Sequence, residues 1–215
     1  LVESGQWTAL RTRPFSKVPG PRETCQSIFV TAMDTNPLTA DPETVIEGRL
    51  DDFKDGIEAL TKLTDGPVHL CCSPGSSLGE VEVEGVQVRY FQGKHPAGLA
   101  GTHIHVLDPV NRDKSVWYIG YPDVAALGSL LTTGRIDVDR VVALGGPAVK
   151  RPRLLKTRMG ALIEPLVEGE LEPGVVRVIS GSVLHGFTAI GRTFGYLGRY
   201  ANQISCLAED NERRF

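Results

Sequence analysis

The sequence predicts an α/β protein in which a Rossmann-like open sheet is followed by a smaller β-grasp domain. An apolar, β-rich run at residues 28–33 meets a polar turn and then Asp41-Pro42, an N-cap residue followed by proline at the first helical position. Strand and helix patterns then alternate at short spacing as far as about Gly134, as in open α/β sheets. Beyond that point, short strands, tight Gly and Pro turns and one short helix favour a β-grasp arrangement. We therefore place two domains at residues 1–134 and 135–215.

Length and charge exclude several classes of protein. With 215 residues and 41% hydrophobic content, the chain is long and apolar enough to build real cores. Its formal net charge is -3, so no overall field draws it toward nucleic acid. The longest nearly uncharged stretches fall far short of the roughly 20 apolar residues that a bilayer span needs. Because the chain begins without Met or a signal segment, we expect it to be a fragment of a longer protein.

The elements of the first domain follow from periodicity and turn signals. Residues 41–64 carry apolar side chains close to the helical period and end at Asp65-Gly66-Pro67, which predicts one continuous helix. Because strand, helix and strand follow at short spacing after Ser27, the strands should be parallel and their connection right-handed. The predicted order is one or two helical turns, a basic loop at 11–17, a strand at 28–33, a helix at 41–64, strands at 68–72, 85–91 and 116–119, and a helix at 121–133.

In the second domain, basic residues alternate along one predicted strand. Short strands are expected from residue 139, within 150–158, at 175–180 and within 195–208, with a helix at 160–167. Alternation puts Arg151 and Arg153 on one face and Lys156 and Arg158 on one face. This basic strand edge either helps to dock the chain onto a partner or is a solvated edge that prevents strand pairing.

Cysteines and histidines offer little sign of a metal. Four cysteines, Cys25, Cys71, Cys72 and Cys206, contain no C-x-x-C pair, so we expect reduced structural thiols. His103 and His105 would share one face of a strand near Asp108, which makes a divalent metal site conceivable. Two imidazoles without a clear third ligand seldom hold zinc, and no partner nucleophile is identifiable. We expect hydrogen-bonded structural histidines, no metal site and no catalytic residue.

The loop that follows the strand at 28–33 has the position of a ligand-binding loop. In open α/β sheets, ligands bind at the carboxyl ends of the strands. This loop lacks the glycines that let a backbone approach a pyrophosphate, so neither a G-x-G-x-x-G nor a P-loop pattern fits it. The sequence therefore predicts the frame of a cofactor domain without a phosphate-binding loop.

Several blocks of sequence closely resemble a known family. They are LVESG and WTALRTRPFSKVP near the start, FVTAMDTNPL at 29–38, GTHIH at 101–105, VISGSVL at 178–184 and YLGRY at 196–200. On these blocks the chain is similar, over its whole length, to the NqrA subunit of bacterial Na+-translocating NADH:quinone oxidoreductases.

This resemblance implies a peripheral subunit on the cytoplasmic face of the bacterial inner membrane. The complex oxidises NADH, reduces quinone and pumps sodium, with its flavins, iron-sulfur centre and membrane spans on other subunits. The implied partners are those subunits, chiefly a membrane subunit, with quinone near by and no nucleic acid. The family also implies a lipoyl-like domain before this chain and a helical region after it.

The resemblance extends in design to RnfC and to the NADH- and FMN-binding subunit of complex I. Those relatives pair a flavin-binding α/β domain with a β-grasp domain of the soluble-ligand-binding type. They carry a glycine-rich FMN loop where this chain has residues 7–19, which contain no glycine. Bulky side chains and missing backbone N–H access should block a flavin phosphate, and no cysteine cluster for an iron-sulfur centre appears. We expect no FMN, NAD, metal or cluster on this chain.

One segment suits a quinone. It lies at the carboxyl end of the first predicted strand and consists of Phe29, Met33, Asp34, Thr35, Asn36 and Pro37. Apolar side chains could contact a quinone ring and tail, while the Thr35 hydroxyl and the Asn36 amide could hydrogen-bond its carbonyl oxygens. The alternative is that Phe29 and Met33 are ordinary sheet core and that the polar turn is only a well-capped loop.

The expected function is that of a cofactor-free docking subunit of the NADH:quinone reductase, close to the quinone and without catalysis of its own. Two alternatives stay open at this point. One is an intact flavin- or nucleotide-binding oxidoreductase domain, which the Rossmann-like order alone supports. The other is a β-grasp module that binds a small ligand, since relatives of that fold bind cobalamin or polysaccharide.

Overall fold

The computed structural model describes residues 1–209, which form two compact units. The first unit contains Leu1–Thr35 and Asp41–Asp137. The second contains Asn36–Ala40 and the chain from Val138 onward. The chain therefore leaves the first unit directly after Thr35, contributes five residues to the second, and returns at Asp41. No signal in the sequence predicted this exchange.

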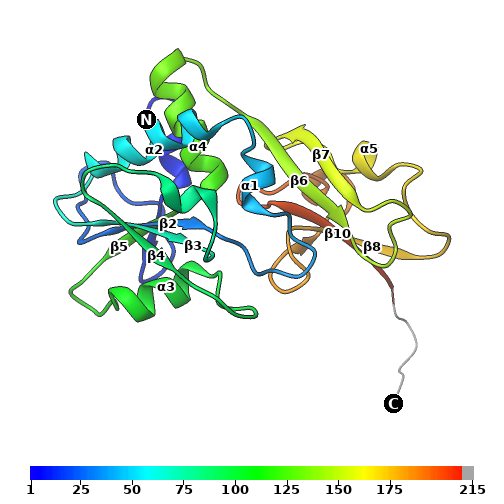
Figure 1. The fold of residues 1–215 in the computed structure, drawn as a ribbon. Helices are drawn as coiled ribbons and strands as arrows, with labels where there is room; N and C mark the ends of the chain where they lie inside the picture. Colours follow the sequence, from blue (N-terminus) through cyan, green and yellow to red (C-terminus); the bar gives the residue numbers. More distant parts are fainter. Residues whose placement is uncertain (210–215) are drawn as a thin grey trace. The chain divides into compact units, whose positions relative to one another are not determined.

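The first unit is built on a five-stranded sheet with the order β1-β5-β2-β3-β4 (Figure 1). Its strands are β1 (Arg11–Arg13), β2 (Ile28–Ala32), β3 (Val68–Cys72), β4 (Val86–Tyr90) and β5 (Val116–Gly120). The pairs β2–β3, β3–β4 and β2–β5 are parallel, and β1 pairs antiparallel with β5. The predicted parallel pairing of the first two strands after Ser27 is thus confirmed.

Helices cover both faces of this sheet. They are η1 (Gln6–Ala9), α1 (Pro42–Val45), α2 (Leu50–Thr61), η2 (Ser77–Glu80), α3 (Ala100–Leu107) and α4 (Tyr121–Thr133). Figure 1 shows α2 and α4 on one face and α3 on the other. On the α3 side, Phe29, Cys71, Ile104 and Val116 form one buried cluster. Central parallel strands are buried on both sides, as expected for this class of sheet.

The second unit is a mixed, β-grasp-like sheet with the order β7-β6-β10-β8-β9. Its elements are β6 (Asp139–Gly145), β7 (Arg153–Arg158), α5 (Glu164–Val167), β8 (Val176–Ser180), β9 (Phe187–Thr188), α6 (Gly191–Phe194) and β10 (Gln203–Ala208). β6 and β10 are parallel, and the other neighbours are antiparallel. Ile163 and Val167, at the short helix α5, pack with Val142 and Ile204 of the sheet. The predicted fold class is confirmed for both units.

Several predicted elements are wrong in extent or type. The single helix predicted at 41–64 is two helices, α1 and α2, separated by a turn in which Gly48 has a φ of 74°. Apolar side chains of both helices face the core, so the helical period continues across the break. The predicted helix at 160–167 is helical only over Glu164–Val167, and within 195–208 only Gln203–Ala208 is a strand. Part of the predicted basic loop at 11–17 is the edge strand β1.

The histidine pair also lies in a different element from the one predicted. His103 and His105 are in helix α3, not in a strand, and the His103 backbone N–H donates to the Leu99 carbonyl at 3.2 Å, four residues earlier, as in a helix. Residues two apart on a helix do not share a face. The prediction that the two imidazoles lie side by side is therefore wrong.

Two glycines set the distance between α2 and α4. A Cβ atom at Gly56 would lie 2.0 Å from the carbonyl oxygen of Val124, and one at Gly128 would lie 1.8 Å from that of Asp52. Both distances are far below van der Waals contact, so the helices pack backbone against backbone at this crossing. This contact brings both helices down onto one face of the sheet.

We predict that Gly128→Ala destabilises the protein by roughly 1–3 kcal/mol or more, because the helices must separate to admit the methyl group. Urea unfolding followed by circular dichroism measures the change. Ser129→Ala, one residue along the same helix, is the matched control and should change the free energy of unfolding by no more than about 0.5 kcal/mol. Equal stability of the wild type and Gly128→Ala would show that the crossing is not tight.

Candidate functional site

The carboxyl ends of the parallel strands meet at one edge of the first sheet. Between the ends of β2 and β3 lies a pocket of about 120 Å³, lined by Ala32, Asp41, Pro42, Glu43 and residues 73–76. Asp41 is the N-cap of α1, as predicted, and its side chain accepts a hydrogen bond from the Glu43 backbone N–H at 3.4 Å. This is the crevice in which open α/β sheets place their ligands.

A carboxylate of the protein itself occupies the anion position at this edge. Glu43 Oε1 accepts a hydrogen bond from the Ser77 backbone N–H at 3.0 Å, and Oε2 accepts one from the Ser77 hydroxyl at 3.1 Å. Hydrogen bonding from the Ser76 side chain, and then from Ser77, holds the pKa of Glu43 below its ordinary value. The carboxylate is therefore charged at neutral pH and uses a backbone N–H that a phosphate would need.

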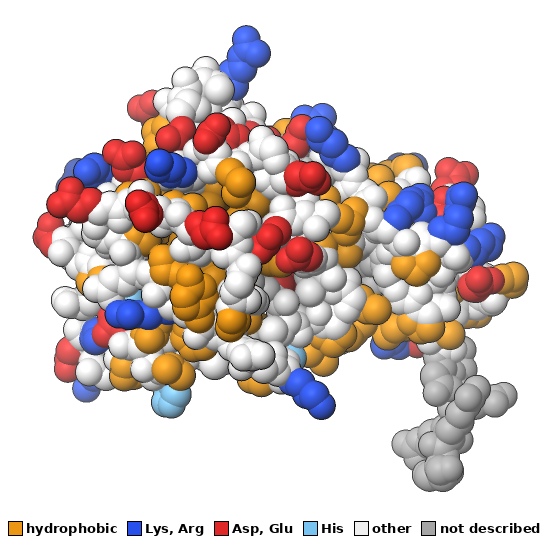
Figure 2. Space-filling view, in the orientation of Figure 1, with side chains coloured by type: hydrophobic (Ala, Val, Ile, Leu, Met, Phe, Trp, Pro, Cys, Tyr) orange, Lys and Arg blue, Asp and Glu red, His pale blue; other side chains and the backbone are white. Residues whose placement is uncertain are grey.

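The electrostatics of this edge oppose anion binding. Glu43 and Asp41 both line the pocket, so an anion there would meet two negative charges, whose repulsion solvent and salt partly screen. Figure 2 shows acidic side chains gathered on this face of the first unit. Sequence reasoning missed Glu43. The available signal was the Ser- and Gly-rich run 73–77 directly after a buried strand, facing an acidic first helical turn.

The apolar part of the predicted quinone segment is in the core. Phe29 is 0% exposed and Met33 is 4% exposed. The ring of Phe29 lies 4.8 Å from that of His69, centroid to centroid, and packs in the cluster under α3. These two side chains fix the end of β2 from within and are not presented at the surface.

The polar part of that segment is divided between the two units. In the first unit, Thr35 Oγ1 accepts a hydrogen bond from the Gly98 N–H at 2.9 Å and lies 3.4 Å from His95 Nδ1. A Cβ atom at Gly98 would lie 2.8 Å from the Thr35 nitrogen, so the two backbones touch. In the second unit, Asn36 Oδ1 is 3.1 Å from His185 Nε2, and the Pro37 carbonyl accepts a hydrogen bond from Gln203 Nε2 at 2.8 Å.

Asp34 and Thr35 thus belong to one unit and Asn36 and Pro37 to the other. Each unit holds its share of the segment by hydrogen bonds of its own. The link between Thr35 and Asn36 is where the chain passes from one unit to the other.

The segment at residues 7–19 packs against the sheet and contributes the edge strand β1. The ring of Trp7 meets that of Trp117 edge to face at 5.6 Å, and its Nε1–H donates to the Pro19 carbonyl at 2.7 Å. Ser16 Oγ and Tyr118 Oη are 2.6 Å apart, and the Arg13 guanidinium lies 5.3 Å from the centroid of the Tyr118 ring. A phosphate loop presents free backbone N–H groups around an open space, whereas this segment packs the bulky ring of Trp7 on Trp117.

His103 and His105 have separate environments. His103 is fully buried, its Nε2 lies 2.8 Å from the Ala97 carbonyl oxygen, and its ring packs on Phe91. Burial lowers the pKa of His103 from 6.5 to about 4. His105 is exposed, and Asp108 instead accepts hydrogen bonds from the Ser27 hydroxyl and Lys114. Within residues 1–209, no group of three or more His, Cys, Asp or Glu side chains is arranged to hold a metal ion.

The basic residues of the second unit are partly neutralised. Arg151 and Arg153 both donate to the carboxylate of Glu170, at 3.1 and 2.7 Å. These two arginines lower the pKa of Glu170, with hydrogen bonding from Arg153 as the largest cause. Lys156 and Arg158 are exposed on β7, which is an edge strand of its sheet. The structure therefore brings Arg151 and Arg153 together, and Lys156 and Arg158 lie farther along the strand.

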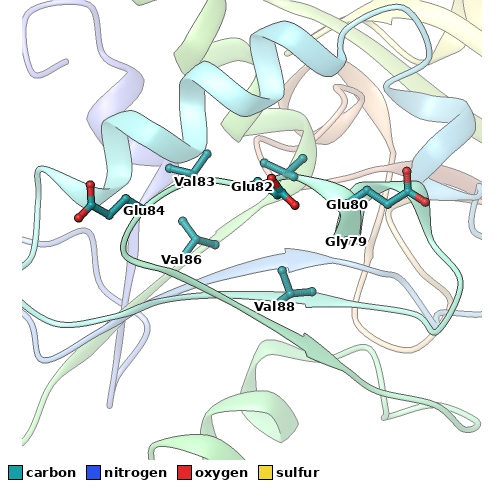
Figure 3. Close-up of a pocket in the computed structure, with 8 residues that line it drawn as sticks. Gly79, Glu80, Glu82, Val83, Glu84, Val86 and Val88 are labelled. Atoms are coloured by element: carbon teal, nitrogen blue, oxygen red, sulfur yellow. The ribbon is translucent and has the colours of Figure 1, made fainter.

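Two further hollows lie away from the strand ends. One, of about 610 Å³, lies between β4 and residues 79–84 in the first unit. Figure 3 shows Val86 and Val88 rising from β4 toward that segment, with Glu80 and Glu84 at its two ends. The other, of about 270 Å³, is in the second unit and is lined by Phe187, Arg199, Tyr200 and their neighbours. None of the helices in the part of the chain that the structure describes is both long and apolar enough to cross a membrane.

Comparison with known proteins points to one family. The family model described as the NqrA second alpha/beta domain matches residues 1–136, and that of the NQRA C-terminal domain matches residues 141–190. The chain is 55% identical, over 100% of its length, to the NqrA subunit of the Na(+)-translocating NADH-quinone reductase of Histophilus somni (strain 2336), and covers 48% of that protein. It is also 55% identical to the corresponding protein of Rhodopirellula baltica and covers 47% of it. The chain spans about half the length of the curated relatives it matches.

Solved structures share the fold at low sequence identity. An NAD+-reducing [NiFe]-hydrogenase in the H2-reduced state matches 96% of this chain, over 46% of its own, with a TM-score of 0.64 and 10% identity. The same enzyme type in the air-oxidized state gives a TM-score of 0.57, over 87% of this chain and 41% of its own, also at 10% identity. At this identity the likeness shows the fold alone.

The buried His103 predicts a pH dependence of stability. Because its folded pKa of about 4 is below its ordinary 6.5, the unfolded chain takes up the proton first as pH falls. The free energy of unfolding should therefore drop between about pH 6.5 and pH 4, by on the order of 2–3 kcal/mol from this residue. Denaturant unfolding at a series of pH values measures it.

His103→Gln keeps a donor for the Ala97 carbonyl but does not titrate, so that part of the drop should disappear. His105→Gln, on the exposed side of the same helix, is the control and should keep the wild-type slope. An unchanged slope in His103→Gln would assign the pH dependence to other groups.

Proposed function

The chain belongs to the NqrA family, and from that premise we propose that it forms part of a peripheral subunit of an Na+-translocating NADH-quinone reductase. In this proposal the subunit lies on the cytoplasmic face of a bacterial inner membrane and docks onto other subunits, chiefly a membrane subunit. It binds no flavin, nucleotide, metal or cluster within these residues. Oxidation of NADH and reduction of quinone then belong to the complex, and this region positions parts of it.

The observation that carries the proposal is the combination of family membership with two carboxylates that line the strand-end crevice. Relatives named as this component of the reductase are 55% identical over the whole of this chain. The crevice at the ends of β2 and β3 is lined by the Asp41 and Glu43 carboxylates, and Glu43 already uses the Ser77 N–H. A phosphate at that position would meet negative charge and compete with Glu43 for the Ser77 N–H, which argues against a nucleotide or flavin there.

The fold likeness to a hydrogenase that reduces NAD+ does not favour an active nucleotide site. At 10% identity it concerns the arrangement of strands and helices. Function resides in the side chains of a site rather than in the fold that carries them. Here those side chains are Trp7, which packs on Trp117, and two carboxylates at the strand ends.

We further propose that the end of β2 lies near the quinone or the membrane subunit that holds it. Within this segment, Phe29 and Met33 are buried in the core. The residues nearer the surface are Asp34, Thr35, Asn36 and Pro37. At the link between Thr35 and Asn36 the chain passes from the first unit to the second. Lys156 and Arg158 on β7 are the basic residues we retain as docking candidates, because Glu170 pairs with Arg151 and Arg153.

The test is the double variant Thr35→Ala, Asn36→Ala in the intact complex. Loss of one or two hydrogen bonds, each worth about 1 kcal/mol, should raise the apparent quinone KM roughly five- to thirty-fold. NADH oxidation with an artificial acceptor should stay at the wild-type rate. Thr61→Ala, Asn111→Ala changes the same residue types at sites away from the strand end and serves as the control.

Wild-type kinetics with both acceptors in the double variant would place the quinone elsewhere. A parallel fall in both activities, or loss of the subunit from the complex, would indicate a structural effect. Measuring the subunit content of each preparation separates these outcomes.

A further inference from the structure

One surface segment of the second unit, residues 184–200, is unusually apolar. Its exposed large side chains are Leu184, Phe187, Ile190, Phe194, Tyr196 and Tyr200, from 42% to 67% exposed. Single exposed apolar residues are ordinary, but a concentration of this kind on one segment marks an interaction surface. Aromatic residues are the side chains most enriched at the energetic centres of protein interfaces.

A preformed pocket lies within this segment. It measures about 270 Å³ and is lined by β9 and the 198–201 turn, with Phe187 and Tyr200 among its walls. Phe187 and Tyr200 are thus both exposed apolar residues of the segment and walls of the pocket. Its size suits one or two protruding side chains rather than a large cofactor.

Glycines fix the shape of the pocket. A Cβ atom at Gly186 would lie 2.5 Å from Ile179 Cγ2, and one at Gly198 would lie 3.1 Å from the Phe187 ring. The Gly198 N–H donates to Ser180 Oγ at 2.9 Å, which ties one wall to the end of β8. The walls are therefore set by backbone packing, so a partner would not have to order them on binding.

All charged side chains in residues 184–200 are basic. Residues 184–200 contain Arg192, Arg199 and His185 but no Asp or Glu. The Arg199 guanidinium lies 5.5 Å from the centroid of the Tyr200 ring, at the wall of the pocket. A surface that combines aromatic side chains with arginines and lacks carboxylates is complementary to an apolar segment that carries acidic residues.

We propose that residues 184–200 dock a different polypeptide of the reductase complex, through an apolar segment that carries Asp or Glu. One apolar side chain of that segment enters the pocket between Phe187 and Tyr200, and a carboxylate lies beside Arg199. The inference rests on the proposed function, because it takes the partner from the same complex. A protein fits better than a lipid surface, because a rigid concave pocket accepts a protruding side chain, whereas a surface that enters lipid must itself protrude.

The experiment uses the full-length subunit in the whole complex, with a photoreactive benzophenone residue at Ile190 or Tyr196. We expect cross-links to another polypeptide of the complex, at a peptide that mass spectrometry identifies as apolar with at least one Asp or Glu. Val175, which is 68% exposed in the same unit but outside the segment, is the control position and should give no such cross-link.

A retention assay gives a second readout. Ile190→Asp should lower retention of the subunit on the complex roughly ten-fold in a salt wash, and Val175→Asp should not. Lys156→Glu, Arg158→Glu, prepared in parallel, reports on the basic edge separately.

Cross-links only to lipid, only within the subunit's own polypeptide, or to no partner would overturn the inference, as would unchanged retention of Ile190→Asp. If the wild-type subunit co-purifies with the complex in those cases, the proposed function stands and the docking surface alone is wrong. If the wild-type subunit does not co-purify with the reductase at all, both fail.

Discussion

The constraint on which the first unit depends is that β2 pairs in parallel with β3 on one side and β5 on the other. A parallel sheet needs helices on both faces, because its central strands have no side that faces water. The backbone contact of α2 and α4 at Gly56 and Gly128 lets both helices cover one face, and α3 covers the other. Parallel pairing also brings the carboxyl ends of β2 and β3 to one edge, so that edge is the natural ligand position.

The function we propose follows from the side chains at the carboxyl ends of β2 and β3. An enzyme with this frame would present backbone N–H groups to a phosphate, as glycine-rich loops do. Here Glu43 takes the Ser77 N–H, Asp41 caps α1, and the segment at residues 7–19 packs Trp7 on Trp117. Directly after Thr35, a few residues beyond the end of β2, the chain passes from the first unit to the second.

The sequence predicted the strands, helices and caps that depend on local residue pattern. The strand Val68–Cys72, the helix Tyr121–Thr133 with its Gly134 cap, and the Asp41 N-cap follow from alternation, period and capping, and the structure confirms them. It could not predict that Gly48 divides a helical pattern, because the apolar period continues across the break. The contacts of Glu43 with Ser77 join residues 34 positions apart, and Phe29 is buried in a cluster that includes Ile104 of α3. Such long-range contacts leave no periodic signal in the sequence.

The most direct test of the proposal that the strand-end crevice binds no flavin or nucleotide is calorimetric titration of the full-length subunit with FMN and with NADH. The account predicts no saturable heat for either ligand, which corresponds to dissociation constants weaker than about 1 mM. Glu43→Gln, titrated alongside, removes one charge from the crevice and shows how far that carboxylate alone opposes the phosphate. Stoichiometric binding of FMN or NADH to the wild-type protein with a micromolar dissociation constant would contradict the account.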